Sequence, residues 1–276
     1  MAILTGYKLR LTTGADHTYV RSDDGYVWGC WDGSDGGQPI CLGEGSSAQA
    51  DCISQPNSHA GLIYGVTGVC HQTANRILYP ARVTVSQAEG YGASCIAYGT
   101  FGKDAYVFFA GRLPQCQVMR SDRAVQPSES VSDLEKKVIK QDEKEAAYVR
   151  KVLALYEPGV LGKATLTEAI PHLLNRELEL TAEYKFDGNL PGNKVNSMQS
   201  AQRDFLKEKE QINQALYAHQ VSHEQFVEKV NGLVREFLRQ CEQILTKEEF
   251  KVMFNMEVGT RFNLVDPEIA AEVLKW

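Results

Sequence analysis

The sequence lacks the patterns that would place it in several large classes of protein. Its 276 residues contain no apolar run near the roughly 20 residues that a membrane-spanning helix needs. A net charge of -6 gives no basic footprint for nucleic acid or for anionic lipid. We therefore expect neither a membrane span nor a nucleic-acid partner.

Signals for export and for metal binding are also missing. The N-terminus, Met1–Lys8, has no basic region followed by a long apolar core, so no cleavable signal peptide is expected. This predicts a protein made in the cytoplasm, and any export would use a route without such a signal. The seven cysteines include no Cys-x-x-Cys pair, so we expect no structural zinc site and no cofactor. Cys41 and Cys52 flank a glycine- and serine-rich loop, and whether they pair stays open.

Composition changes sharply near residue 120. Residues 1–120 hold 17 of the 23 glycines and only 17 charged residues, whereas residues 121–276 hold 6 glycines and 47 charged residues. The first part is typical of short strands with tight turns, and the second of amphipathic helices. We predict an α+β protein with a small antiparallel-sheet domain over residues 1–120, a linker over 121–132 and an all-α domain over 133–276.

Turn signals and short apolar runs define the elements expected in the first part. The Asp24-Gly25 step predicts a hairpin between β-type runs at 17–20 and 25–28. Residues 32–58 are expected to form a long loop. Further strands are predicted at residues 8–11, 83–85, 96–98 and 105–109.

The second part follows a helical pattern with recognisable starts. Ser222 precedes Gln225 by three residues and Thr246 precedes Glu249 by three, which is the spacing of a capping box. Asp266 is followed by a proline at the favoured first helical position. Helices are predicted over about 132–156, 165–186, 197–219 and 222–245, with shorter ones from 246 and 266.

The segment Gly68–Leu78 places a cysteine where nucleophiles are commonly prepared. A Gly-Val turn delivers Cys70 to the first turn of a predicted helix, whose apolar face follows the i, i+3, i+4 spacing. The positive end of the helix dipole favours a thiolate there and lowers the pKa of the thiol. Cys70 is therefore the candidate nucleophile.

A cysteine nucleophile needs a histidine within reach and usually a third group that orients the histidine. His71 follows Cys70 directly, and neighbours on a helix point about 100° apart, so His71 is poorly placed to be the base. The next histidine along the chain is His172, so the base is expected upstream. His17, at the head of a hairpin strand, is the candidate, and His59 in a loop is the runner-up.

A histidine on an early hairpin followed by a cysteine on a later helix resembles the circularly permuted papain-like fold. This is the fold of the lecithin-retinol acyltransferase-like and NlpC-type cysteine hydrolases. Asp16–Val20 is similar to the family's histidine strand, and residues 70–75 resemble its cysteine box, Asn-Cys-Glu-His-Phe-Ala/Val-Asn, at the Cys, the Ala and the Asn. The sequence departs from the box at residues 69, 71 and 72. It also has Trp28-Gly29 where the acyltransferase group places a second histidine. The resemblance covers about residues 10–110.

The resemblance implies a thiol amidase or peptidase in which His17 takes the proton of Cys70 and an acyl-thioester forms. The orienting residue is not assigned: Asp32 is the tentative candidate, and Cys30 or a backbone carbonyl are alternatives. The expected substrate is a peptide or amide, such as peptidoglycan or a protein amide bond attacked by a bacterial effector or toxin. The helical domain would cover the cleft or bind a partner or inhibitor protein.

Two other classes stay open. Gly68-Val69-Cys70 also matches the Gly-x-Cys helix start of transglutaminase-like enzymes, which transfer acyl groups or deamidate, although their downstream His and Asp pair is missing. The third class is a non-catalytic interaction protein, in which Cys70 is a small buried side chain and the charged helices bind a partner. Selective labelling of Cys70 by a thiol reagent, lost in His17→Ala, separates the enzyme from the interaction protein.

Overall fold

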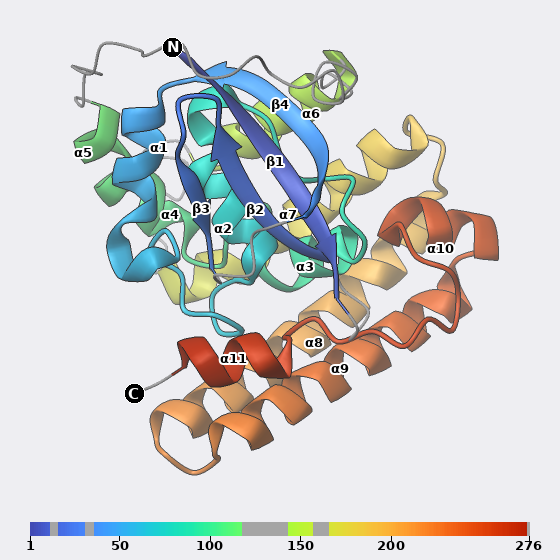
Figure 1. Cartoon of the computed structure of the whole chain (residues 1–276). Coiled ribbons are helices and arrows are strands. Elements are labelled where there is room, and N and C mark those ends of the chain that lie inside the picture. The colour runs from blue at the N-terminus through green and yellow to red at the C-terminus, as the bar shows by residue number, and fades with distance from the viewer. Residues whose placement is uncertain (12–15, 31–35, 118–142, 157–165, 275–276) are drawn as a thin grey trace.

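A small antiparallel sheet and a larger set of helices make up the chain, which confirms the predicted α+β class (Figure 1). The predicted linker, residues 121–132, lies outside the residues that the structure describes. The structure is a computed structural model that describes residues 1–11, 16–30, 36–117, 143–156 and 166–274.

The sheet consists of three consecutive antiparallel strands and a fourth strand that crosses over to pair with the first. Its strands are β1 (Ala2–Arg10), β2 (Asp16–Ser22), β3 (Val27–Gly29) and β4 (Gln38–Gly45). Their order is β3-β2-β1-β4, and every neighbouring pair is antiparallel. The turn between β2 and β3 contains Gly25 at a φ of 97°, a conformation that favours glycine, so the predicted hairpin is confirmed.

The prediction of a long loop over residues 32–58 is wrong from residue 38 onward. Strand β4 pairs with β1 along its length, and the helix α1 (Ser47–Ser54) follows, with the Ser46 side chain accepting a hydrogen bond from the Gln49 N–H. A short 3-10 turn, η1 (Pro56–Ser58), ends the region. Strand β4 carries little alternation of its own, and its pairing with β1 holds it in place.

Two fully buried helices, α2 (Cys70–Ile77) and α3 (Tyr91–Tyr98), lie behind the sheet (Figure 1). Helix α2 packs on β2, where Leu4 and Val20 of the sheet meet Ile77 in one apolar cluster. Burying an aliphatic side chain of this kind contributes about 1.5–3 kcal/mol, so this cluster fixes α2 firmly beneath the strand that carries His17.

Three of the predicted strands are wrong. Residues 96–98 lie in α3, which is buried on every side, so its sequence carries no helical periodicity that would distinguish it from a buried strand. Residues 83–85 follow the 3-10 turn η2 (Tyr79–Ala81) without regular structure. The last apolar run is helical, and it spans α4 (Ala105–Val107), the π-helical η3 (Phe108–Arg112) and α5 (Leu113–Gln117).

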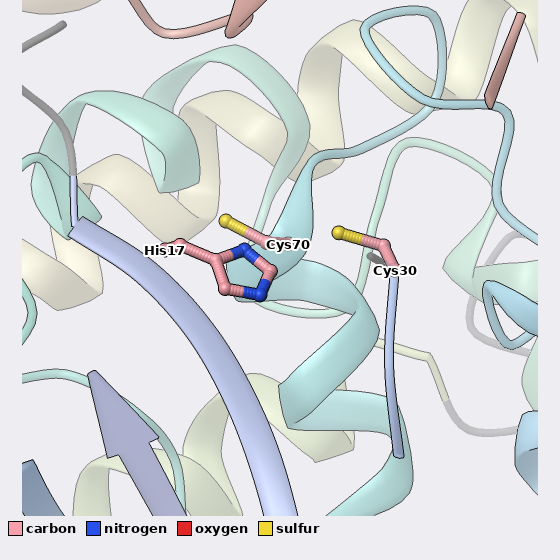
Figure 2. A group of neighbouring side chains, drawn as sticks. All are labelled: His17, Cys30 and Cys70. Carbon is pink, nitrogen blue, oxygen red and sulfur yellow. The ribbon is translucent and has the colours of Figure 1, made fainter. Parts of the chain in front are cut away.

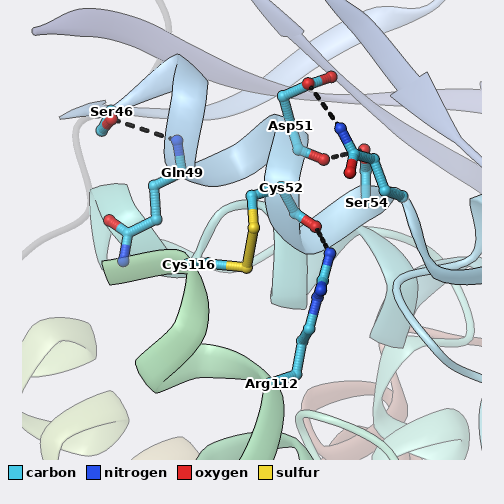
Figure 3. The surroundings of a disulfide bond; sticks show 8 residues. Ser46, Gln49, Asp51, Cys52, Ser54, Arg112 and Cys116 are labelled. Carbon is cyan, nitrogen blue, oxygen red and sulfur yellow. Dashed lines mark hydrogen bonds between the residues drawn. A yellow bond between two sulfur atoms is a disulfide. The ribbon is translucent and has the colours of Figure 1, made fainter. Parts of the chain in front are cut away.

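One disulfide joins α1 to α5 (Figure 3). It links Cys52 to Cys116, whose Cα atoms are 5.6 Å apart and whose positions differ by 64 residues. Arg112 donates a hydrogen bond to the Cys52 carbonyl beside it. The possible pairing of Cys41 with Cys52 does not occur, because Cys41 is a free, buried cysteine.

The described residues from 143 onward are mainly helical, and the predicted starts of three helices are confirmed. Ser222 and Thr246 accept hydrogen bonds from the N–H groups three residues on, and Asp266 caps its helix from the side chain. Among the described residues, no helix has both the length and the apolar character of a transmembrane span. The helices are α6 (Glu143–Ala154), α7 (Leu166–Phe186), α8 (Gly192–Tyr217), α9 (His223–Ile244), α10 (Lys247–Phe254) and α11 (Pro267–Val273).

The helical part packs directly on the part that carries Cys70. The long helices α8 and α9 run side by side, and α11 lies along α9 (Figure 1). One hydrophobic cluster contains Cys30, Val66 and Cys70 together with buried side chains of α7 to α11. Lys209 of α8 donates a hydrogen bond of 2.8 Å to the Val66 carbonyl, so the segment that precedes Cys70 is held from the helical side.

Candidate active site

Three side chains converge where β2, the end of β3 and the start of α2 meet (Figure 2). They are His17 of β2, Cys30 directly after β3 and Cys70, the first residue of α2. One ring nitrogen of His17 and the two sulfurs all lie within 4.8 Å of one another. The three residues are 0%, 3% and 5% exposed, so they form a buried cluster.

Cys70 stands at the N-terminus of α2 because the helix begins at this residue. Val69 has extended backbone, and its N–H donates a hydrogen bond of 3.1 Å to the Gln72 side-chain oxygen. The first helical bonds run from the Gln72 and Thr73 N–H groups to the Val69 carbonyl. The N–H groups of Cys70 and His71 therefore precede the helical ladder, and together with the helix dipole they favour negative charge at this end.

His71 fixes the start of α2 against β2 and α3. Its Nε2 donates to the Asp16 carbonyl over 3.0 Å, and its Nδ1 shares a hydrogen bond of 2.9 Å with the Ser94 hydroxyl. The Cys70 sulfur lies 3.7 Å from the same Asp16 carbonyl. His71 is thus occupied in positioning Cys70 beside the strand that carries His17, and it is not placed to act as the base.

The electrostatics of the cluster favour a thiolate on Cys70. A hydrogen bond from the Cys30 thiol holds the pKa of Cys70 well below its ordinary value, aided by charge on His71 and by a hydrogen bond and charge from His17. Burial acts in the opposite direction. The same Cys30–Cys70 bond, together with burial, raises the pKa of Cys30 well above its ordinary value. Cys70 is therefore the more acidic of the two thiols, and Cys30 is the less acidic one.

Further groups hold the Cys30 side of the cluster. The Nε2 of His59 lies 3.0 Å from the Cys30 carbonyl and donates to it, so His59 anchors the backbone of Cys30. The Tyr64 hydroxyl accepts a hydrogen bond of 3.2 Å from the N–H of Asp266, at the start of α11. Burial raises the pKa of Tyr64, and negative charge on Cys70 and Cys30 raises it further.

The structure brings together the two principal residues that the sequence analysis selected, Cys70 and His17. Asp32, the tentative orienting residue, lies outside the described residues. Cys30, which was an alternative at that position, is the third member of the cluster. The signal available for it was its place directly after a short strand that pairs with β2.

Sequence reasoning missed the contribution of the helical part to the surroundings of the cluster. Tyr64 and Asp266 are 202 residues apart in the chain, and no local pattern links them. Comparisons with protein-family models, with curated proteins and with solved structures found no match to this chain. The functional proposal therefore depends on the geometry and chemistry of the cluster.

Proposed function

We propose that the chain is a cysteine hydrolase of the permuted papain-like type, with Cys70 as nucleophile and His17 as base. The observation that carries this proposal is the position of Cys70 at the start of α2 with a His17 ring nitrogen within 4.8 Å of its sulfur. Hydrogen bonds to a reacting group are often long before substrate binds, so this separation is compatible with proton transfer in the complex.

The arrangement supports a two-stage acyl transfer. His17 takes the thiol proton of Cys70, and the thiolate attacks the carbonyl carbon of an amide. The N–H groups at the start of α2 stabilise the oxyanion of the tetrahedral intermediate. The imidazolium then protonates the leaving nitrogen, the C–N bond breaks and an acyl-thioester remains. Water, deprotonated by His17, hydrolyses the thioester and regenerates the thiol.

Cys30 takes the third position of the site in this proposal. Its thiol donates a hydrogen bond to the Cys70 sulfur and thus stabilises the thiolate. In other cysteine hydrolases an ion pair with histidine stabilises the thiolate. Cys30 does not orient His17 in the way that a carboxylate would. The pair of thiols is the feature that separates this site from the family box that the sequence resembles.

The proposed substrate class is peptide or side-chain amide bonds, including peptidoglycan stem peptides and protein amides. The test is mass spectrometry of these substrates after incubation with wild type, Cys70→Ala and His17→Ala. Loss of an amide bond with wild type alone supports the proposal. Cleavage that persists in Cys70→Ala contradicts it. An added amine that appears in the product instead of water would identify acyl transfer.

The disulfide Cys52–Cys116 supports action in an oxidising compartment. Such bonds persist in secreted and periplasmic proteins and are rare in the cytosol. We propose that the chain is made in the cytoplasm and acts after export, as an effector does. Alkylation of the denatured protein without reductant should therefore modify five of the seven cysteines, and prior reduction should make Cys52 and Cys116 reactive as well. A partner or inhibitor protein on the helical part stays a prediction.

A further inference from the structure

The buried cluster has a second chemical property besides nucleophilicity. It offers one imidazole nitrogen and two sulfurs as donors, from His17, Cys30 and Cys70, all within 4.8 Å of one another. Sulfur and imidazole donors select zinc and similar thiophilic cations over magnesium or calcium. Two cysteines and one histidine with an open fourth position are a known zinc ligand set. The donors lie 13 and 40 residues apart in sequence, so the Cys-x-x-Cys rule does not apply to them.

The spacing of the donors fits a single ion. Zinc binds sulfur at about 2.3 Å and imidazole nitrogen at about 2.0–2.1 Å, so tetrahedral donors lie about 3.4–3.8 Å apart. Donor atoms that already lie within 4.8 Å of one another need to approach by little more than about 1 Å. Rotation of three short side chains supplies this closure. The Asp16 carbonyl joins β2 to the start of α2 through His71, and β3, which ends just before Cys30, pairs with β2.

The charge of a loaded site suits its burial. Two thiolates balance the charge of Zn²⁺, and a neutral imidazole adds none, so the complex of the ion with its three protein ligands is neutral. An uncompensated ion in this apolar cluster would be strongly disfavoured. On binding, the Cys30 and Cys70 thiols release their protons to the buffer, two Zn–S bonds and one Zn–N bond form, and water molecules leave the hydrated ion. One water is retained in the open fourth position.

We propose that His17, Cys30 and Cys70 bind one Zn²⁺ ion and that this ion reversibly blocks the nucleophile. The ion occupies the sulfur lone pair that would attack the substrate and the ring nitrogen that would accept the proton. Binding itself is independent of catalysis, whereas the inhibitory role rests on the proposed function. Cys30 is the member that distinguishes this site from an ordinary Cys-His pair, because it supplies the second sulfur.

The binding experiment uses the metal-free full chain with its disulfide intact. Zn²⁺ is titrated by calorimetry, and Co²⁺ by absorption spectroscopy, which reports thiolate ligands directly through a charge-transfer band. The variants are Cys30→Ser and His17→Ala, and Cys41→Ala is the matched control, because Cys41 is another free, buried cysteine outside the cluster. Circular dichroism checks that each variant is folded.

We expect one ion per chain in wild type and in Cys41→Ala. Loss of an outer-shell partner typically weakens metal binding 10–100-fold, so loss of a ligand in Cys30→Ser should weaken it by about 100-fold or more. Zn²⁺ should also raise the melting temperature of wild type but not that of Cys30→Ser. Absence of binding to wild type, or equal affinity in Cys30→Ser and Cys41→Ala, overturns the metal site.

The inhibitory role is tested separately by alkylation of Cys70 with iodoacetamide, followed by peptide mapping. Zn²⁺ should suppress the reaction of wild type, and a chelator should restore it. Unchanged alkylation in the zinc-loaded protein, or greater hydrolysis with zinc than without it, overturns inhibition. A failed proposed function has a different signature: zinc still binds through Cys30, but the metal-free protein cleaves no amide.

Discussion

Replacing Cys30 should change the pH at which Cys70 becomes reactive. The thiol of Cys30 makes the largest contribution to holding the pKa of Cys70 below its ordinary value. A hydrogen bond to a charged group contributes about 1.5–3 kcal/mol, and one pKa unit corresponds to about 1.4 kcal/mol. Cys30→Ala should therefore raise the pKa of Cys70 towards its ordinary value.

The assay is the rate of iodoacetamide alkylation of Cys70 as a function of pH, in the presence of a chelator, with the modified peptide quantified by mass spectrometry. Only the thiolate reacts, so the alkylation rate decreases when the pH is lowered below the pKa of the thiol. At a pH below both pKa values the Cys30→Ala variant should react about 10–100-fold more slowly than wild type, in proportion to its smaller thiolate fraction. Above both pKa values it should react at least as fast, because a more basic thiolate is more nucleophilic.

The control is Cys41→Ala, in which a buried thiol is removed elsewhere in the core. It should leave the pH profile of Cys70 unchanged. If the midpoint of the profile is the same in Cys30→Ala and in wild type, the Cys30 hydrogen bond does not prepare the thiolate. If Cys30→Ala instead lowers the alkylation rate by the same factor at every pH, the substitution has altered the access of the reagent to Cys70.

Other substitutions test the frame around the site. Burial raises the pKa of Glu177, so the stability that this side chain contributes is complete below its ordinary pKa near 4.3 and is lost as pH rises through the folded-state pKa. The stability of Glu177→Gln relative to wild type, measured by urea unfolding, should therefore increase from pH 4 to 7. A difference in stability that does not depend on pH would contradict this. Loss of the Cys52–Cys116 disulfide in Cys52→Ala should cost about 2–4 kcal/mol in the same measurement, and no loss would show that the bond does not form. Gly65 has a φ of 74°, and an added Cβ would lie 3.1 Å from the Phe226 and Val265 side chains. At Gly25 an added Cβ would meet no atom within 4 Å, so Gly25→Ala should cost only the roughly 1–2 kcal/mol of left-handed strain. Gly65→Ala should therefore reduce the free energy of unfolding by more than Gly25→Ala does. Equal reductions would exclude the packing effect.

Local signals made the helical part predictable. The capping residues Ser222, Thr246 and Asp266 lie within three residues of the groups that they bind, and the helices after them carry one apolar face. Prediction failed where burial is complete. Helix α3 is buried all round, so its apolar run had the appearance of a strand. Strand β4 depends on its partner β1 rather than on its own pattern.

The part of the candidate site that could be predicted from the sequence is the part that follows from eliminating other histidines and cysteines. The start of α2 selected Cys70, and the distribution of histidines left His17 as the upstream partner. Cys30 was one of several alternatives, because nothing in its sequence neighbourhood fixes the direction of its side chain. The pairing of Cys52 with Cys116 and the contact of Tyr64 with Asp266 join residues far apart in the chain, so they follow from the tertiary structure alone.

The most direct test of the Cys70–His17 pair is detection of the covalent intermediate. Metal-free protein is mixed with an activated p-nitrophenyl ester, and nitrophenol release is followed together with the intact mass. Wild type should show a burst of nitrophenol and an acyl group that peptide mapping locates on Cys70. The burst should be slowed in His17→Ala and absent in Cys70→Ala. No acyl adduct on Cys70 of wild type, or an adduct that forms equally fast in His17→Ala, would contradict the proposed site.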